Sequence, residues 1–230
     1  MYTVARARRA AFLLLLCAAV LLAACGNSED KAQQPIAPAP QAVQKPQSVV
    51  RTYVPITGSH VSFVGTKNGD TDVPGTIPTV QGQLTVDLTN LRTATGSITV
   101  DLSGLNTELE ARDLNIREHF FSVADSAMKD ASFELRGFTT NQPSIADGAT
   151  TGGTLKGQLR FRGLASMMAV PVNVSRDGDR LTVKSTGIFK IQIGDWNLEE
   201  AHKKLMEVCG HTMLSEDFPV QFEMVLAPKL

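Results

Sequence analysis

Apolar and polar residues alternate along much of the chain from residue 60 onward. In "HVSFVG" Val61 and Phe63 fall on one face of an extended segment, and in "GQLTVDLT" Leu84 and Val86 do the same. This alternation is typical of antiparallel strands with one buried and one solvated face. It recurs in further runs, with these inward positions: Ile98, Val100 and Leu102; Phe133 and Leu135; Leu155, Gly157, Leu159 and Phe161; Val170, Val172 and Val174; Leu181 and Val183; Ile191 and Ile193; Val220, Phe222, Met224 and Leu226.

Short turn sequences separate these runs, such as "NGD" at 68–70 and "RDGD" at 176–179. About eight antiparallel strands with little helix between them predict an all-β fold, either a closed barrel or a sandwich. A barrel of that size is wide enough to be packed with side chains or to hold one small ligand. The alternation alone leaves these possibilities open.

The stretch "NTELEARDLNIREHFF" (106–121) predicts a first short helix. Thr107 and Glu110 fit a capping box at its start. Its apolar face would carry Leu109, Ile116 and Phe120, with Phe121 beside it, turned toward the interior. The charges are explained by two i,i+4 ion pairs, Glu108 with Arg112 and Asp113 with Arg117. We therefore interpret this charged stretch as the solvated side of a structural helix rather than as a catalytic cluster.

A second helix is predicted in "NLEEAHKKLMEVCGHTM" (197–213). Asn197 and Glu200 form another possible capping box, and Gly210 stands where a helix-ending glycine belongs. We interpret this segment as structural packing. Its alternative interpretation is a copper site, because histidine, cysteine and methionine are copper ligands. The candidate ligands are His202, Cys209, His211 and Met213.

The N-terminus resembles a lipoprotein signal. Basic residues precede a short apolar run that ends in Leu-Ala-Ala-Cys, so residues 1–24 are predicted to be a signal peptide and Cys25 the site of lipid attachment. Residues 25–51 are rich in Pro, Gln and Ala and are predicted to form a disordered tether. Residues 52–230 would form the folded domain, held on a bacterial membrane by the acylated cysteine. The glycine at position 26 is compatible with the outer membrane, facing the periplasm.

Charge and cysteine usage exclude several classes of function. The chain has 22 basic and 23 acidic residues and no basic block, so nucleic acid is not expected as a partner. Once Cys17 leaves with the signal and Cys25 is acylated, only Cys209 remains, so no internal disulfide is expected. No catalytic motif is recognisable, and we expect no enzymatic activity. The sequence predicts no oligomeric state.

The order of motifs resembles the YceI-like family of periplasmic polyisoprenoid-binding proteins. "RDLNIREHFF" is similar to the family's "RD-x-H-L-R-x-x-x-FF" signature, although Asn115 stands where the family often has histidine. "GSHVSFVGTK", "GSITVDLSGLNT", "ASFELRGF", "GQLRFRGLASMMAVPVNV" and "IFKIQIGDW" resemble the surrounding strands in the same order. The resemblance covers nearly all of residues 53–228.

The resemblance implies an antiparallel lipocalin-like β-barrel of about eight strands with two short helices, and an apolar cavity that holds an isoprenoid chain. The expected function is a membrane-anchored carrier or reservoir for an isoprenoid lipid, such as a quinone or polyprenol, with no other cofactor required. The alternatives are the copper protein and an envelope module with a filled barrel. The candidate lipid-binding residues are Phe63, Leu84, Val86, Ile98, Val100, Phe120, Phe121, Phe133, Leu135, Leu159, Phe161, Val172, Phe189, Phe222 and Met224.

Overall fold

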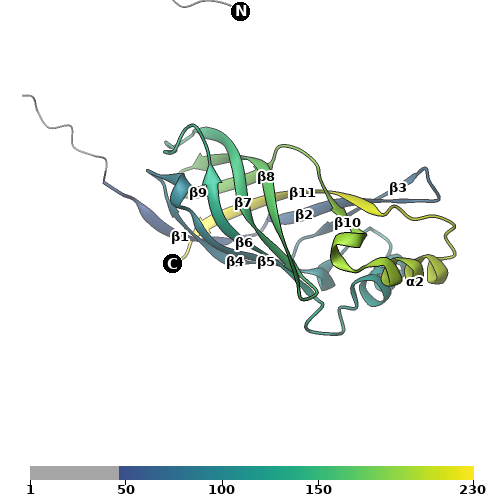
Figure 1. The fold of residues 1–230 in the computed structure, drawn as a ribbon. Coiled ribbons are helices and arrows are strands. Elements are labelled where there is room, and N and C mark those ends of the chain that lie inside the picture. Colours follow the sequence, from purple (N-terminus) through teal and green to yellow (C-terminus); the bar gives the residue numbers. More distant parts are fainter. Residues whose placement is uncertain (1–46) are drawn as a thin grey trace, which may run out of the picture. The chain divides into compact units, whose positions relative to one another are not determined.

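The computed structural model describes residues 47–230, which form eleven strands and several short helices (Figure 1). The strands are β1 (Val50–Pro55), β2 (His60–Lys67), β3 (Thr71–Ile77), β4 (Val80–Asp87), β5 (Thr95–Asp101), β6 (Asp130–Thr139), β7 (Thr150–Phe161), β8 (Leu164–Asp177), β9 (Arg180–Ser185), β10 (Phe189–Gln192) and β11 (Asp217–Pro228). The helices are α1 (Glu110–Asn115), the π-helix η3 (Ile116–Phe121), α2 (Glu199–Cys209), and the 3₁₀ turns η1 (Leu91–Thr93), η2 (Leu102–Gly104) and η4 (Ile193–Trp196).

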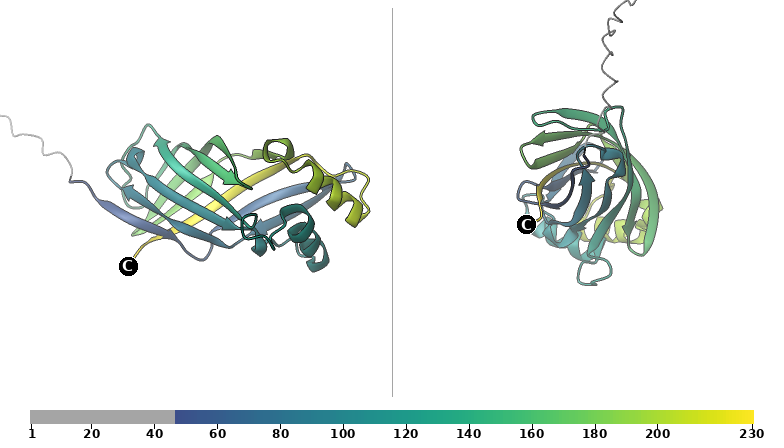
Figure 2. Two further views of the ribbon diagram at one scale, coloured as in Figure 1. Left: turned by 60° about the horizontal axis from the view of Figure 1, so that its bottom comes forward. Right: turned by 90° about the vertical axis from the view of Figure 1, so that its left-hand side faces the viewer.

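Eight of the strands close into an antiparallel barrel. The order around the ring is β1-β4-β5-β6-β7-β8-β9-β11, and pairing of β11 with β1 closes it. Figure 2 shows this ring of strands from one end. The prediction of an all-β barrel of about eight strands is confirmed, as is the presence of two short helices, and the sandwich alternative is wrong.

Strand β11 extends the wall beyond this closed ring. Its C-terminal part pairs with β9 on one edge and β1 on the other, whereas its N-terminal part pairs with β10 and β2. Strand β3 pairs with β2 only, and beyond it a single bridge joins Thr76 to Asn106. Helices α1 and α2 lie at this extended end, opposite the end at which β1 begins (Figures 1 and 2).

Strands β1 and β3 are absent from the prediction. Strand β3 contains Pro74 and Gly75, which break the apolar alternation, and an edge strand is where proline is tolerated because one row of its amides lacks partners. Gly75 is required there because the ring of Phe63 lies against it, and a Cβ would come within 2.3 Å of that ring. Strand β1 begins at Val50, close to the expected start of the folded domain at residue 52.

The interior contains two separate apolar clusters. The first lies within the closed ring and includes Tyr53, Val172, Leu181 and Leu226, each 2% exposed or less. The second lies at the helical end and is built around Leu105, Phe120, Phe161, Trp196 and Leu205. The protein therefore has two apolar cores rather than one continuous core.

Neither predicted capping box forms. Helix α1 begins after Leu109, and α2 begins after Leu198, without a side-chain cap at either position. Asn197 itself has a left-handed backbone, with φ of 52°. The prediction for the end of α2 is confirmed, because Gly210 follows Cys209 with φ of 64°.

The predicted signal peptide at 1–24, Cys25 and most of the predicted tether lie outside the described residues. Between residues 47 and 230, no helix is long and apolar enough to cross a membrane.

Candidate ligand-binding cavity

An apolar cavity of about 320 Å³ lies in the barrel between the two clusters. Its wall is almost entirely hydrocarbon and is contributed by strands on all sides of the barrel and by both helices. Because the interior is hollow here, the alternative of a filled barrel is wrong for the part of the chain that the structure describes.

Most of the candidate lipid-binding residues line this cavity. The exceptions are Val86 and Val172, which are 5% and 1% exposed and belong to the packed cluster within the ring. They are buried in the barrel as the alternation predicts, but they do not line the cavity. The candidate residues on the cavity wall are Phe63, Leu84, Ile98, Val100, Phe120, Phe121, Phe133, Leu135, Leu159, Phe161, Phe189, Phe222 and Met224.

A glycine on β7 leaves room for an inward-facing ring. Leu135 of β6 pairs with Gly157 of β7, and the ring of Phe133 lies over this glycine. A Cβ at position 157 would come within 2.4 Å of the Phe133 ring. Phe133 can therefore lie along the wall instead of projecting across the barrel, which keeps the interior open.

Edge-to-face aromatic pairs form the helical end of the cavity wall. The Phe120 and Phe121 ring centroids are 5.0 Å apart with the rings 78° to each other. Phe218 packs against Phe120 at 5.7 Å, and Phe161 against Phe121 at 6.0 Å. Such pairs are favoured by the ring quadrupole and hold a wall rigidly while leaving its inner surface apolar.

The change from α1 to the π-helix η3 places both of these phenylalanines at the cavity. Ile116, Phe120 and Phe121 line it, as the predicted inward orientation of the two rings requires. Leu109 does not, because it precedes the helix and is 54% exposed, so its placement on the apolar face was wrong. The π-helix ends at Ser122, whose backbone is left-handed with φ of 56°.

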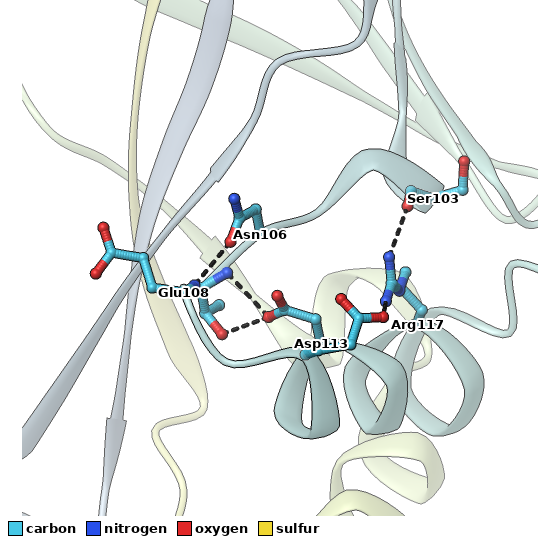
Figure 3. A network of polar contacts seen from close by, with 7 residues as sticks. Ser103, Asn106, Glu108, Asp113 and Arg117 are labelled. Carbon is cyan, nitrogen blue, oxygen red and sulfur yellow. Dashed lines mark hydrogen bonds and ion pairs between the residues drawn. The ribbon is translucent and has the colours of Figure 1, made fainter.

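A buried polar network fixes the start of α1 (Figure 3). Asp113, 3% exposed, accepts hydrogen bonds from the backbone N–H of Thr107 at 2.9 Å and from its hydroxyl. Arg112 Nε donates to the same hydroxyl at 2.7 Å, and its Nη2 donates to the Thr107 carbonyl at 2.5 Å. Since Asp113 and Arg112 both use the Thr107 hydroxyl, it does not cap the helix.

The predicted i,i+4 ion pairs are absent from the described salt bridges. Arg117 instead pairs with Glu110 at 2.5 Å and donates to the Ser103 carbonyl at 3.3 Å (Figure 3). Glu108 has a left-handed backbone, and its N–H donates to the Asn106 side chain at 2.7 Å. The charges nevertheless serve the structural role that the sequence suggests, because they hold the loop and helix that carry the two phenylalanines.

Asn115 differs from the residue common in the family, and it joins the two helices. Its Nδ2 donates to the Sγ of Cys209 on α2 at 3.6 Å. Cys209 lines the cavity, whereas Asn115 does not. Asn115 therefore contributes to the packing of α1 against α2 rather than to the cavity surface.

The cavity wall has a small polar sector at the helical end. Lys67 at the end of β2, Arg112 on α1 and His211 after α2 contribute to it, and all three are partly exposed. Burial lowers the pKa of His211, and the charge of Lys67 lowers it further. Among the residues that the structure describes, no carboxylate lines the cavity.

This sector and part of the wall were not among the predicted site residues. Lys67 follows Val61, Phe63 and Gly65 at alternate positions of β2, so the alternation itself could have found it. His211 lies beyond a helix, where no periodicity applies. Trp196, in η4, is 3% exposed and also lines the cavity.

The four residues considered as copper ligands have separate surroundings. His202 is buried, with its Nε2 3.0 Å from the Leu214 carbonyl oxygen. Cys209 accepts from Asn115, and Met213 is 57% exposed. Within residues 47–230, no three His, Cys, Asp or Glu side chains are grouped so that they could hold a metal ion.

Comparison with solved structures shows the same fold. A polyisoprenoid binding domain from Saccharophagus degradans, implicated in plant cell wall breakdown, superposes with a TM-score of 0.66 at 18% identity, covering 79% of this chain and all of that one. Burkholderia cenocepacia BcnA gives 0.55 at 16% identity, over 73% and 95% of the two chains. The Campylobacter jejuni YCEI protein gives 0.52 at 17%, over 70% and 86%.

A search of curated proteins gives no match. The sequence model of the YceI-like domain, in contrast, matches residues 53–226. That span contains nearly all of the barrel, both helices and the whole cavity wall. The chain therefore belongs to the YceI-like family.

Proposed function

We propose that this protein binds the apolar chain of an isoprenoid lipid, such as a quinone or a polyprenol, inside its barrel. The observation that carries the proposal is the cavity between the two clusters, whose wall is apolar except for one sector at the helical end. A ligand site of this kind needs few polar groups, and these orient the ligand rather than supply its affinity.

The size and lining of the cavity support a slender hydrocarbon ligand. Its volume of about 320 Å³ is at the lower end of the range of roughly 300–1,000 Å³ that is common for ligand sites. Each CH₂ group moved from water into such a site contributes about 0.8 kcal/mol. A few isoprene units are therefore enough for useful affinity without any specific contact.

The family relationship supports the same proposal. One structural neighbour is described as a polyisoprenoid binding domain. In this chain the rings of Phe133, Phe189 and Phe222 face the cavity from three different strands. These rings offer a continuous apolar surface to a flexible chain, and a carrier or reservoir role follows more naturally than catalysis.

Lipid extraction tests the proposal. The full chain is purified from its membrane in mild detergent, extracted with organic solvent and analysed by mass spectrometry. We expect an isoprenoid lipid in the extract of the wild type and much less in that of Val183→Phe, which fills the cavity from β9. Equal amounts of the lipid in both extracts, or none in the wild type, would count against the proposal.

We also propose that the protein is anchored to a bacterial envelope membrane through Cys25, at the outer membrane and facing the periplasm. The support is the basic and apolar leader that ends in Leu-Ala-Ala-Cys and the Pro-rich segment that follows it. Two or more acyl chains on one residue give stable anchoring.

Metabolic labelling with a fatty acid tests the anchor. The wild type should carry the label and sediment with membranes, whereas Cys25→Ser should do neither. Label retained by Cys25→Ser would refute acylation at this residue. Separation of inner and outer membranes then tests the expected location.

A further inference from the structure

We infer that an isoprenoid chain enters the barrel sideways, through a slot in the wall between β8 and β10, and not through the helical end. The slot is the space between residues 164–170 of β8 and residues 187–192, which include β10. This inference rests on the proposed function and adds the route by which the ligand reaches the cavity.

The hydrogen-bonded wall of the barrel is interrupted along this slot. Strand β8 pairs with β7 from its first residue, Leu164, but with β9 only from Val172 onward. Strand β10 pairs with β11 alone. In the described part of the chain, no β-pairing or backbone hydrogen bond joins residues 164–170 to residues 187–192. One edge of β8 therefore has no strand paired to it here.

Two contacts mark the ends of the slot. At one end the Thr186 N–H donates to the Pro171 carbonyl at 3.0 Å, which joins the chain after β9 to β8. At the other end the Phe161 ring of β7 packs against the Trp196 ring of η4, with the ring centroids 6.2 Å apart. Residues 164–170 lie between these contacts and extend for roughly 20 Å at the rise of a β-strand. A slot of that length can admit several isoprene units lengthwise.

The cavity lies behind the slot. Met168 and Val170 of β8 line the cavity from one side, and Phe189 and Ile191 of β10 line it from the other. Side chains on both sides of the interruption therefore face the same apolar space. A hydrocarbon chain that passes between β8 and β10 arrives in the cavity.

The outer rim of the slot is apolar. Met167 on the β8 side is 65% exposed and Ile188 on the β10 side is 63% exposed, so that, apart from Leu230, they are the most exposed large apolar side chains of residues 47–230. The β8 side, "LASMMAV", carries no charge. Exposed strand edges are usually protected by charged side chains or proline. An uncharged rim of this kind favours contact with a hydrocarbon ligand.

The slot and the helical end differ in charge. A chain that entered at the helical end would pass Lys67, Arg112 and His211, and displacing water from such polar groups is unfavourable. The only charged residue of β10, Lys190, forms a salt bridge with Asp217 of β11, on the side away from β8. The slot is therefore the less polar of the two routes.

A passage and a binding contact have different kinetic signatures. A residue that borders only the passage changes the barrier that the ligand crosses on entry and on exit. The association and dissociation rates then fall by the same factor, and the dissociation constant is unchanged. A residue that touches the bound ligand changes the dissociation constant, mainly through the dissociation rate.

Stopped-flow kinetics tests the inference. The full chain, purified in mild detergent, is mixed with a ubiquinone that carries two isoprene units, and quenching of the single tryptophan, Trp196, follows binding. Dilution into ligand-free detergent gives the dissociation rate. Met167→Lys and Ile188→Lys each place a charge on the rim. We expect each to lower both rates together, by at least about fivefold, with an unchanged dissociation constant.

Comparable substitutions at the helical end are the control. Met213→Lys and Val208→Lys alter apolar residues that are 57% and 40% exposed and do not line the cavity, and their rates should equal those of the wild type. Met167→Cys, labelled after folding with a polyethylene glycol maleimide, provides a second obstruction if the lysine variants fail to fold. Wild type treated with the same reagent corrects for labelling of Cys209.

Each outcome is decisive. Unchanged rates in the rim variants and in labelled Met167→Cys would overturn the inference and leave the proposed function intact, as would slower rates in Met213→Lys and Val208→Lys. A dissociation constant that rises in the rim variants without slower association would also overturn it, because these residues would then contact the bound ligand. If the wild type binds no ubiquinone, the proposed function is refuted instead.

Discussion

The two parts of the barrel interior differ although similar strands build them. Within the closed ring, Val172 and Leu181 are 1% and 2% exposed, and aliphatic side chains fill the space between the strands. Around the cavity, phenylalanines such as Phe133 and Phe222 are only partly buried and face open space. The packed ring and the cavity wall therefore have the same inward alternation and different side-chain volumes.

This difference shows what keeps a barrel interior open. Large rings do not fill it, because Phe63 and Phe133 lie over glycines of the neighbouring strands. The aromatic pairs at the helical end stiffen the wall without closing the space. The packed ring supplies stability, and the cavity wall, which is held by polar contacts at α1, supplies the site.

Truncation of one leucine in each part should show that the packed ring contributes more to the free energy of unfolding than the cavity wall does. Leu181→Ala removes a fully buried side chain from the packed ring and should lower the free energy of unfolding by about 2–5 kcal/mol. Leu159→Ala, on the cavity wall, should cost less, because one side of Leu159 already faces open space. Denaturant unfolding measures both. Equal losses would mean that the two parts are equally well packed.

Removal of the buried charge at α1 should loosen the helical end alone. Asp113→Asn weakens two hydrogen bonds to Thr107 and should lower the free energy of unfolding by about 1–3 kcal/mol. Hydrogen exchange should increase in α1 and η3 and remain unchanged in β8 and β9. Glu118→Gln, an exposed change on the adjoining η3, is the control. A uniform increase over the whole barrel would contradict a local role.

Filling the cavity should affect binding more than stability. Val183→Phe adds volume where the interior is open, and we expect at least about tenfold weaker isoprenoid binding with a change of less than about 1 kcal/mol in the free energy of unfolding. Its cross-strand partner Val174 is buried in the packed ring, so Val174→Phe should cost about 1–3 kcal/mol. Calorimetric titration and denaturant unfolding measure the two effects. If Val183→Phe lowered the free energy of unfolding more than Val174→Phe, the open space would not lie beside Val183.

The smallest expected effect is the loss of stability at low pH caused by protonation of Asp87, which ends β4 and pairs with Val50 of β1. Hydrogen bonds from Ser48 and Thr89 lower the pKa of Asp87 from its ordinary value of 3.8 to about 2. Because the folded-state pKa is the lower one, the ionised group stabilises the fold above pH 3.8, and this contribution is lost as the pH falls to about 2. Asp87→Asn should therefore lose less stability than the wild type over this window. Identical acid unfolding curves would show that these contacts do not contribute.

Much of the barrel was predictable because alternation determines which side chains face inward. It placed Phe133, Leu159 and Phe222 correctly, and the same rule applied to Lys67 would have identified one member of the polar sector of the cavity wall. It could not predict whether the interior is filled, since Val172 and Leu159 satisfy it equally.

The remaining differences arise from contacts that local sequence does not contain. Thr107 matches a capping motif, but its hydroxyl is used by Asp113 and Arg112 after the chain folds back. Strand β3 contains a proline that local patterns exclude from strands, and only its position at a sheet edge accommodates it. His211 reaches the cavity because a β-bridge joins its loop to β2. The two paired residues, Lys67 and Leu214, are far apart in the sequence.

The central claim, that the cavity binds an isoprenoid chain, is tested most directly through Trp196. This residue is the chain's single tryptophan, is 3% exposed and lines the cavity. Titration with a short-chain isoprenoid quinone should quench its fluorescence saturably, and Val183→Phe should shift the curve to higher ligand concentration. Quenching that does not saturate, or that is identical in wild type and Val183→Phe, would contradict binding within the barrel.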